Sequence, residues 1–350
     1  MIASIEKPEK ILVIRLSSIG DIILTTPLLR ALKRAFPDAG IDFVVKSRFR
    51  ELLVGNPNIE RIIPFDDEKS YSELRRIRQQ ILEKKYDWLI DIHKNLRSLF
   101  LRSGSGARHL FRYNKHRIRR FLLIQFKWDR YPKIAPVFKR YMQELIAVGV
   151  EDDDRGPELF VDPAASERVN SDFGAFFDAH DCIIGLVPGA SYATKRWLPD
   201  RFAEVGKRFV EAHHAGVVLF GSSSERALNE EIMLSIGSRN ALSLAGKTSL
   251  QESMAAMAKC NLVISNDSGF MHVAEALKKK LVALFGATTA QLGFFPVGEN
   301  CIVVQNEDLG CRPCTHIGSQ RCPKKHFKCM QEISVEEVYA AAVGLLEGSA

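Results

Sequence analysis

The sequence predicts an α/β protein with two parallel sheets and helices packed around them. Short apolar runs of strand length, among them ILVI, IDFVV, CIIGLV and LVALF, alternate along the chain with longer stretches of helical character. A strand buried on both faces of a parallel sheet is apolar throughout, so these runs are typical of parallel strands. Their alternation with helices indicates βαβ units.

The first half is expected to hold four strands, each followed by a helix or a turn. The run ILVI precedes a predicted helix over residues 22–36, and IDFVV precedes one over residues 48–55. IIPF is followed by a predicted helix over residues 71–85, whereas DWLIDI ends in a turn. This order predicts one parallel sheet in the first half.

The second half repeats the pattern. CIIGLV leads to a predicted helix over residues 199–211, and GVVLF to one that begins at Glu225. NLVI precedes a predicted helix over residues 268–278, and LVALF is the last strand. The final helix, residues 334–346, is preceded by SVEE, which fits a capping box.

A break in the pattern predicts the domain boundary. Acids and prolines cluster in VEDDDRGPELFVDPAAS, residues 150–166, which we interpret as a linker. A chain of 350 residues is long enough for two domains, each with its own core. We therefore expect domains over residues 1–155 and 156–350. The acid run Asp152–Asp154 is expected to be solvated.

Composition narrows the class of protein. There is no run of 18 apolar residues, and MIASIEKPEKI lacks the apolar block of a signal peptide, so we expect a cytosolic chain without a membrane span. Seven cysteines fit a reducing compartment better than a disulfide framework. Cys182, Cys260 and Cys301 lie in or beside predicted strands and are expected in the core.

Four further cysteines follow the spacing C-x2-C-x7-C-x6-C near the end of the chain. They are Cys311, Cys314, Cys322 and Cys329. A CxxC pair with two more cysteines can hold zinc or an iron–sulfur cluster, but the second pair lacks the usual close spacing. Reduced thiols without metal are the expected state, and a structural metal is the alternative.

Positive charge is concentrated between Arg97 and Arg140. That stretch has thirteen lysines and arginines and one acid, Asp129. A solvated helix face would mix both signs, so the segment favours an anionic partner: nucleic acid, a phosphorylated lipid or a membrane surface. Interleaved aromatic residues suit stacked bases or an amphiphile with a phosphorylated head. They are Phe111, Tyr113, Phe121, Phe126, Trp128 and Tyr131.

Four polar loops follow predicted strands, and ligands of open α/β sheets bind at the carboxyl ends of strands. The loops span residues 15–21, 188–197, 221–225 and 265–269. One lies in the first half and three lie in the second. This distribution predicts that a donor substrate is held mostly by the second half and an acceptor substrate by the first.

The loop PGASYATKRW, residues 188–197, has the composition of a phosphate site. Ser191 and Thr194 can donate hydrogen bonds, and Lys195 supplies a positive charge for phosphate oxygens. The alternative is a flexible polar loop. Neither GxxxxGK[ST] nor a GxGxxG after an opening strand is present, which argues against a P-loop protein and a dinucleotide oxidoreductase.

In ISNDSGFMHVAEAL, Asp267 lies at the start of a predicted helix, with Gly269 and His272 close behind. Asp267 as a simple N-cap is the alternative interpretation. A cap requires neither the glycine nor the histidine, so we favour a site for a sugar or a diphosphate at the helix N-terminus. Asp21 in RLSSIGD also precedes helical residues, whose N–H groups stabilise a carboxylate.

Several motifs together resemble the ADP-heptose:lipopolysaccharide heptosyltransferases of glycosyltransferase family 9. The motifs are RLSSIGDIILTTPLLRALK, PGAS…KRWLPDRFAEVGKRF, LAGKTSL and SNDSGFMHVAEAL…LFGATT. The resemblance implies a GT-B fold, with two Rossmann-like domains facing across a cleft. It implies an acceptor-binding domain over 1–155 and a nucleotide-sugar-binding domain over 156–350. It also implies inverting, metal-independent transfer of L-glycero-D-manno-heptose from ADP-heptose to Kdo2-lipid A or its heptosylated form.

The same resemblance implies roles for individual residues. Asp21 corresponds to the catalytic base, with Ser17 and Ser18 beside it on the acceptor side. The residues implied in donor binding are Ser191, Thr194, Lys195, Glu225, Thr248, Asp267, Ser268, Gly269 and His272. Some family members carry two hydroxyl residues where this chain has Ala190 and Ser191. One side-chain contact to phosphate is therefore expected to be replaced by a backbone contact.

The basic segment fits an acidic acceptor. Arg117, Arg119 and Arg120 are the candidate contacts to lipid A–Kdo, and we expect a monomer at the inner face of the inner membrane that binds no nucleic acid. The chain's only DxD, Asp152–Asp154, lies in the expected linker, so no metal or other cofactor is expected. The alternatives are a family 9 transferase with another nucleotide sugar, a GT-B sugar-nucleotide epimerase, or a nucleic-acid-binding α/β protein.

Overall fold

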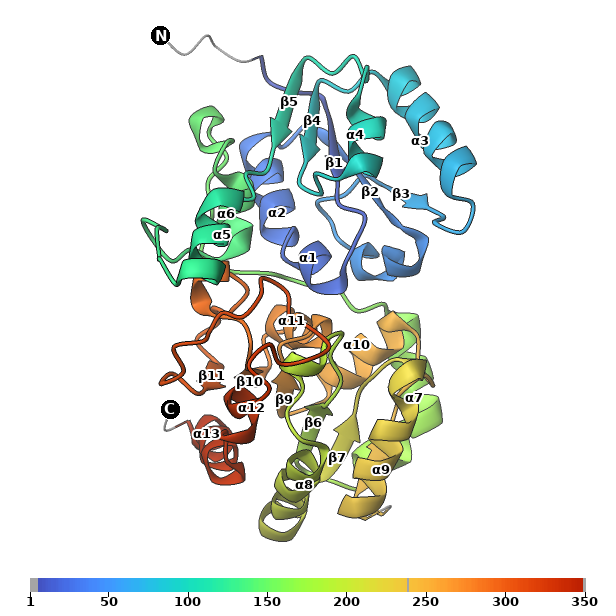
Figure 1. Ribbon diagram of the computed structural model, residues 1–350. Helices are drawn as coiled ribbons and strands as arrows, with labels where there is room; N and C mark the ends of the chain where they lie inside the picture. The colour runs from blue at the N-terminus through green and yellow to red at the C-terminus, as the bar shows by residue number, and fades with distance from the viewer. Residues whose placement is uncertain (1–5, 238, 349–350) are drawn as a thin grey trace. The chain divides into compact units, whose positions relative to one another are not determined.

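The computed structural model describes residues 6–237 and 239–348, which form two compact units, each around its own sheet (Figure 1). One unit contains the residues up to Lys115 together with Val137–Phe160. The other contains His116–Pro136 and the chain from Val161 onward. The units therefore divide between Phe160 and Val161, and the segment 116–136 is grouped with the second unit although it interrupts the first in sequence.

The first unit has a five-stranded sheet in the order β3-β2-β1-β4-β5, and all its strand pairs are parallel. The strands are β1 Lys10–Ile14, β2 Gly40–Lys46, β3 Arg61–Phe65, β4 Trp88–Asp91 and β5 His109–Arg112. Its helices are α1 Ile19–Ile23, α2 Thr26–Ala35, α3 Ser70–Lys84, α4 Leu96–Arg102 and α6 Val137–Met142, with 3-10 turns at Ser47–Leu53 and Ile146–Val148. The core packs Ile77 and Ile81 of α3 against Leu12, Val44 and Leu89 of the sheet.

The second unit has a six-stranded parallel sheet in the order β11-β10-β9-β6-β7-β8. Its strands are β6 Ile183–Val187, β7 Gly216–Leu219, β8 Ala241–Ser243, β9 Leu262–Asn266, β10 Lys280–Phe285 and β11 Cys301–Gln305. Its helices are α5 Arg117–Phe126, α7 Pro163–Asp178, α8 Pro199–His213, α9 Arg226–Ile236, α10 Leu250–Ala258, α11 Gly269–Ala276, α12 Lys328–Gln331 and α13 Val335–Glu347. The 3-10 turns are Ala193–Lys195, Ser223–Glu225 and Ala290–Leu292.

Two all-parallel sheets with flanking helices confirm the predicted fold class. The capping box before the last helix is also confirmed, since Ser334 Oγ accepts from the N–H of Glu337 at 3.1 Å and the Glu337 carboxylate accepts from the N–H of Ser334 at 2.7 Å. Within the described residues, no helix is both long and apolar enough to cross a bilayer.

Some elements differ from the sequence prediction for local reasons. The single helix expected over 22–36 is two helices, because Pro27 has no N–H and its ring would clash with the carbonyl of a continuous helix one turn earlier. The helix expected over 48–55 is the 3-10 turn Ser47–Leu53. Three strands were not predicted: β5 and β11 are edge strands without a fully buried residue, and β8 has three residues.

The expected linker is only partly a linker. Helix α7 begins inside it at Pro163, with Asp162 as its N-cap, where the Asp162 side chain accepts from the N–H of Ala164 at 3.0 Å. The preceding acids pack on the first unit. Arg30 donates to both carboxylate oxygens of Asp153, from Nε at 2.7 Å and from Nη2 at 2.6 Å.

The expectation of a solvated acid run is therefore wrong for Asp153, whose side chain is 14% exposed against 7% for Arg30. It is also wrong for Asp152, whose side chain is 15% exposed and pairs with Lys139 at 3.3 Å. Only Asp154, at 80%, is open to solvent. The hydrogen bonds from Arg30 lower the pKa of Asp153 to about 2.

The predicted core cysteines are buried to different degrees. Cys260 is buried, whereas Cys182 and Cys301 are half-buried. Burial raises the pKa of Cys260 and of Cys301 to about 12, so both thiols are protonated at neutral pH.

Asp153→Asn tests the buried pair. The pKa of Asp153 is lower in the folded chain than its ordinary value of 3.8, so the pair stabilises the fold above about pH 4 and this contribution is lost as the pH falls toward 2. At pH 7 we expect the variant to lose about 2 kcal/mol of unfolding free energy in urea titrations. The difference from the wild type should shrink between pH 4 and pH 3. Asp154→Asn is the control, and an equal loss in both variants would contradict the assignment.

Candidate functional site

The loop after β1 is organised by a buried arginine. Arg15 is 7% exposed and donates from Nη1 to the carbonyl of Ile92 at 2.8 Å and from Nε to the carbonyl of Ser17 at 2.8 Å. Its Nη2 lies 2.5 Å from Oδ2 of Asp21. The guanidinium therefore ties the loop after β1 to the loop after β4 and holds the Asp21 carboxylate.

The Asp21 carboxylate also accepts hydrogen bonds from nearby groups. Ser18 donates from its N–H at 3.4 Å and from Oγ at 3.2 Å, and Tyr141 donates from its hydroxyl at 3.3 Å. Ser18 is the N-cap of α1, and Asp21 is the third residue of that helix. Ser17 is half-buried beside them. Asp21 is thus part of a capping box and of an ion pair in which Arg15 is buried and Asp21 is half-buried.

The charge of Asp21 follows from these contacts. Burial on its own raises the pKa of the carboxyl, but the charge of Arg15 and the hydrogen bonds from Arg15 and Ser18 outweigh it, so the pKa lies below its usual range. Asp21 is ionised at neutral pH, as expected from the sequence. The same contacts make it a weaker base than a free carboxylate.

His93 is a further group of this loop cluster that the sequence analysis missed. It follows β4, and burial together with the positive charges of Arg15 and Lys115 lowers its pKa to about 3. Its Nδ1 is buried without a hydrogen-bond partner among the described residues. The imidazole is neutral at physiological pH. The signal available in the sequence was a histidine just after an apolar strand, in DIHKN.

In the second unit, Lys195 and Asp267 form a buried pair. Lys195 Nζ lies 2.7 Å from Oδ2 of Asp267, and the two side chains are 14% and 6% exposed. The hydroxyl of Thr288 donates to the same carboxylate oxygen at 2.6 Å. The structure therefore brings together the cation of the loop 188–197 and the acid of the loop 265–269.

Asp267 is not the N-cap of the following helix. Ser268 holds that position in α11 and accepts from the N–H of Met271 at 3.4 Å, and Gly269 is the first helical residue. The alternative in which Asp267 is a simple cap is therefore wrong. His272 is buried one turn into α11, where its Nδ1 lies 3.1 Å from a carboxylate oxygen of Glu275.

Glu225 packs against the loop after β6. A Cβ on Gly189 would lie 1.9 Å from Oε1 of Glu225, so only glycine fits at that position unless Glu225 moves. The other carboxylate oxygen accepts from the N–H of Ser222 at 2.7 Å and from its hydroxyl at 2.8 Å. This carboxylate thus lies beside the loop that carries Ser191 and Lys195.

The remaining predicted donor residues have different surroundings. Ser191 is exposed. Thr248 is half-buried, with its hydroxyl 2.8 Å from that of Ser253. Thr194 is buried, and its hydroxyl donates to the carbonyl of Ser319 at 3.0 Å and accepts from the N–H of Ser319 at 2.8 Å. The Thr194 hydroxyl therefore holds the loop to the chain's last third.

The strand order explains why these loops meet. In the second sheet the chain runs from β6 to β7 and β8 on one side and returns to β9 on the other, so the loops after β6 and β9 flank a topological switch point. Lys195 and Asp267 lie in those loops. In the first sheet β1 lies between β2 and β4, and Asp21 and His93 follow β1 and β4. Each unit thus has its charged cluster at a switch point.

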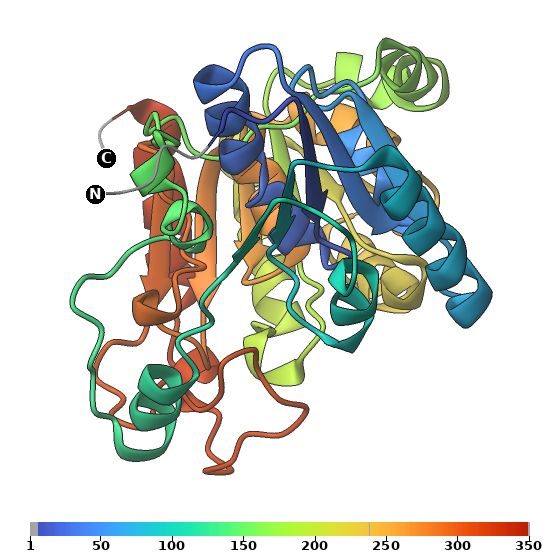
Figure 2. The same cartoon turned by 90° about the horizontal axis from the view of Figure 1, so that it is seen from above.

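Residues 116–136 of the basic segment are grouped with the second unit, and the rest of it is grouped with the first. Arg117, Arg119 and Arg120 lie in α5, and none of them forms an ion pair with a described residue. Figures 1 and 2 show this segment beside the chain's last third, where Lys127 donates to the carbonyl of Pro313 at 2.7 Å.

The segment also exposes large apolar side chains. Ile118 is 77% exposed, and Phe121 and Trp128 are each 56% exposed. Arg117 is exposed beside them, whereas Arg119 and Arg120 are half-buried.

The cysteine-rich tail has no assembled metal site among the described residues, where no group of three or more His, Cys, Asp or Glu could hold a metal ion. All seven cysteines are free. Cys311 Sγ lies 3.7 Å from Nε2 of His326.

Known proteins match this chain over most of its length. The pattern of glycosyltransferase family 9 (heptosyltransferase) matches residues 74–325. Lipopolysaccharide heptosyltransferase 2 of Salmonella typhimurium is 30% identical over 300 residues, which cover 80% of this chain and 83% of that protein.

Solved structures match it as well. The glycosyl transferase family 9 from Veillonella parvula has a TM-score of 0.80 at 28% identity, covering 97% of this chain and 98% of that one. E. coli ADP-heptose lps heptosyltransferase II has a TM-score of 0.76 at 25% identity, covering 97% and 99%.

Lys195→Ala tests the buried pair of the second unit. The variant leaves the Asp267 carboxylate buried with only the Thr288 hydroxyl, and breaking a buried pair from one side costs about 3–5 kcal/mol. We expect a loss of that order in the free energy of unfolding by urea titration. Lys195→Met with Asp267→Asn removes both charges and should recover much of the loss. A double variant as unstable as Lys195→Ala would show that the charges are not coupled.

Proposed function

Because the chain belongs to glycosyltransferase family 9, the heptosyltransferases, we propose that it transfers L-glycero-D-manno-heptose from ADP-heptose to the lipopolysaccharide inner core. The observation that carries the proposal is the Lys195–Asp267 pair at the switch point of the second sheet, next to the start of α11. Similar relatives from several organisms are named heptosyltransferase 2. They favour an acceptor that already bears one heptose.

The donor is bound by the second unit. Lys195 supplies a positive charge close to the diphosphate. The N–H groups at the start of α11, beside Ser268 and Gly269, donate hydrogen bonds to the diphosphate oxygens. Ser191 is exposed and free to donate a hydrogen bond to the diphosphate. Because Lys195 is already paired with Asp267, the diphosphate has to compete with that carboxylate or share the ammonium with it.

Other residues of the second unit bind the sugar and the nucleoside. Asp267 and His272 contact the heptose, Glu225 the ribose, and Thr248 lies near the adenine. Thr194 acts indirectly, since its hydroxyl is engaged by Ser319 and holds the loop in place.

Asp21 is the general base. The acceptor hydroxyl attacks the anomeric carbon as its proton passes to the Asp21 carboxylate, and the bond from that carbon to the phosphate oxygen breaks. ADP leaves with the bonding electrons, and attack from the opposite face inverts the configuration. Arg15 keeps Asp21 ionised and oriented, and Ser17 and Ser18 position the acceptor. Lys195 and the helix N–H groups stabilise the leaving diphosphate without a metal ion.

The acceptor is recognised by charge. Lipid A–Kdo carries phosphates and carboxylates, and the unpaired arginines of α5 are suited to them. The exposed Ile118, Phe121 and Trp128 beside those arginines favour a peripheral position at the inner face of the inner membrane. We infer that the protein works there as a monomer and binds no nucleic acid.

The central experiment measures heptose transfer with purified protein. ADP-heptose should be used with Kdo2-lipid A and with heptosyl-Kdo2-lipid A, each in excess EDTA. We expect transfer to the heptosylated acceptor with EDTA present. A requirement for added metal would overturn the metal-free mechanism, and no transfer to either acceptor would overturn the proposed function. ADP should also raise the Tm, whereas UDP-sugars should not.

Asp21→Asn should reduce kcat by about two to four decades, because the amide cannot take up the acceptor proton. It also leaves Arg15 buried without its anion, so a lower Tm is expected as well. Arg15→Met combined with Asp21→Asn removes both charges, and it should recover stability without recovering kcat. ADP affinity should be unchanged in both variants. Near-full turnover by Asp21→Asn would exclude it as the base.

Reversal of the α5 arginines tests acceptor binding. The triple variant Arg117→Glu, Arg119→Glu, Arg120→Glu should raise the acceptor KM and weaken sedimentation with phosphatidylglycerol vesicles, since three cationic contacts become repulsive. ADP affinity, measured by calorimetry, should not change.

A matched control reverses three exposed cations around α3: Lys69→Glu, Arg75→Glu, Lys85→Glu. It changes the net charge equally and should leave vesicle binding and acceptor KM close to wild type. Equal effects from the two triple variants would show that only net charge matters. A fall in ADP affinity in the α5 variant would make the segment a structural part of the second unit.

A further inference from the structure

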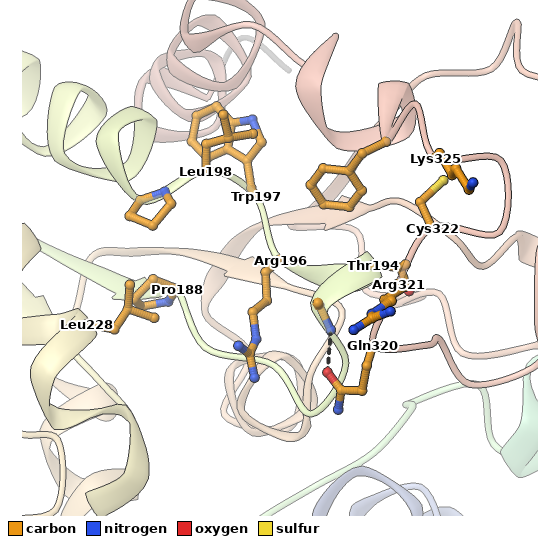
Figure 3. Close-up of a pocket in the computed structure, with 13 residues that line it drawn as sticks. Pro188, Thr194, Arg196, Trp197, Leu198, Leu228, Gln320, Arg321, Cys322 and Lys325 are labelled. Carbon is orange, nitrogen blue, oxygen red and sulfur yellow. Dashed lines mark hydrogen bonds between the residues drawn. The ribbon is translucent and has the colours of Figure 1, made fainter.

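A pocket of about 560 Å³ opens in the second unit beside the proposed donor loop (Figure 3). One wall is the chain around Pro188–Pro199, and another is the tail around Gln320–Phe327, with Leu228 of α9 closing the side. The volume is typical of a site for a small organic ligand. The proposed function makes no use of this space.

The pocket has an apolar body. Trp197, Leu198, Leu228 and Phe327 line it, and most of the exposed lining is apolar. Trp197 is 1% exposed, and its indole N–H donates to the carbonyl of Ile333 at 3.0 Å, so its ring is a fixed part of the wall. An apolar surface of this kind favours the hydrocarbon part of a ligand.

The charged part of the lining is cationic. Arg196, Arg321 and Lys325 contribute to it, no acidic residue does, and none of the three forms an ion pair with a described residue. Arg196 uses Nε on the carbonyl of Ala190 at 2.7 Å, which holds the guanidinium at this wall. Figure 3 shows Arg196 and Arg321 on two sides of the same space. Such unpaired cations favour an anion.

The pocket is separate from the residues proposed to bind ADP-heptose. Of those residues only Thr194 lines it, and the Thr194 hydroxyl is taken by Ser319. Lys195 is next to Arg196 in sequence, but its ammonium is paired with Asp267 and does not line the pocket. Gln320 closes the wall by accepting from the N–H of Ala193 at 3.4 Å and donating to the carbonyl of Ser191 at 3.0 Å.

We propose that this pocket is a second binding site, for a single-chain amphiphile with a phosphate or carboxylate head. The hydrocarbon chain packs on Trp197, Leu198, Leu228 and Phe327. The head lies at the rim, where Arg196, Arg321 and Lys325 supply the charge. The ligand is either a free amphiphile or a bilayer lipid, of which one hydrocarbon chain and the headgroup occupy the pocket.

Octyl phosphate, below its critical micelle concentration, is the probe, titrated by calorimetry into the protein saturated with ADP. We expect saturable binding of one molecule that ADP does not displace. Inorganic phosphate lacks the hydrocarbon chain, and octyltrimethylammonium lacks the anionic head. Each should bind at least about tenfold more weakly than octyl phosphate. Displacement by ADP would overturn the proposal, because the probe would then occupy the donor site.

Charge reversal at the rim tests the location. Arg321 and Lys325 are exposed, so Arg321→Glu with Lys325→Glu should keep the fold and weaken octyl phosphate binding by at least about tenfold. Lys324→Glu with Lys328→Glu alters the same exposed segment outside the pocket and should bind as the wild type does. Equal loss in both variants would overturn the assigned location.

The α5 triple variant should bind octyl phosphate as the wild type does, and loss of binding there would assign the probe to the basic segment instead. Sedimentation with phosphatidylglycerol vesicles separates the two sources of ligand. Weaker sedimentation of the rim variant assigns the site to a bilayer lipid, and unchanged sedimentation assigns it to a free amphiphile.

Discussion

In a parallel sheet the loops that follow the strands all lie at the same edge, and this constraint places the candidate site residues of both units. The loops after β1 and β4 hold Asp21 and His93 in the first unit. The loops after β6 and β9 hold Lys195 and Asp267 in the second. Strands on either side of a switch point send their connections to opposite faces, which leaves room for a ligand between the loops.

Charged residues at these edges are already neutralised by partners within the protein. Arg15 pairs with Asp21 and Lys195 with Asp267, and all four side chains are at most 21% exposed. In the proposed mechanism, each pair holds the base or the diphosphate-binding cation in a defined position before substrate arrives, as preorganised catalysis requires. If substrate binds at these residues as proposed, its binding has to redistribute the two ion pairs.

The segment 116–136 shows how connectivity and packing can differ. It leaves the first unit after Lys115 and returns at Val137, yet its contacts group it with the second unit. Lys127 bonded to the carbonyl of Pro313 is one such contact. The proposed acceptor surface on α5 therefore belongs to the same compact unit as the proposed donor residues.

Several features followed from local sequence. Apolar runs identified the central strands, because a doubly covered strand has no polar face, and SVEE identified the last helix through its capping box. The motifs around Asp21, Lys195 and Asp267 identified the family and the candidate loops. The edge strands β5 and β11 were not predicted from apolar runs. An edge strand has a neighbouring strand on one side only, so it needs fewer apolar residues.

Other features depend on residues far apart in the sequence and became visible only in the folded chain. Asp153 reads as part of a solvated acid run, yet Arg30 binds it from a helix more than a hundred residues earlier. Tyr141 reaches Asp21 in the same way. Local periodicity records whether a side chain is buried, but it carries no information on which distant partner meets it. The sequence by itself determined the central strands, the candidate loops and the family, while the ion pairs at these loops and the pocket beside Trp197 were decided by tertiary packing.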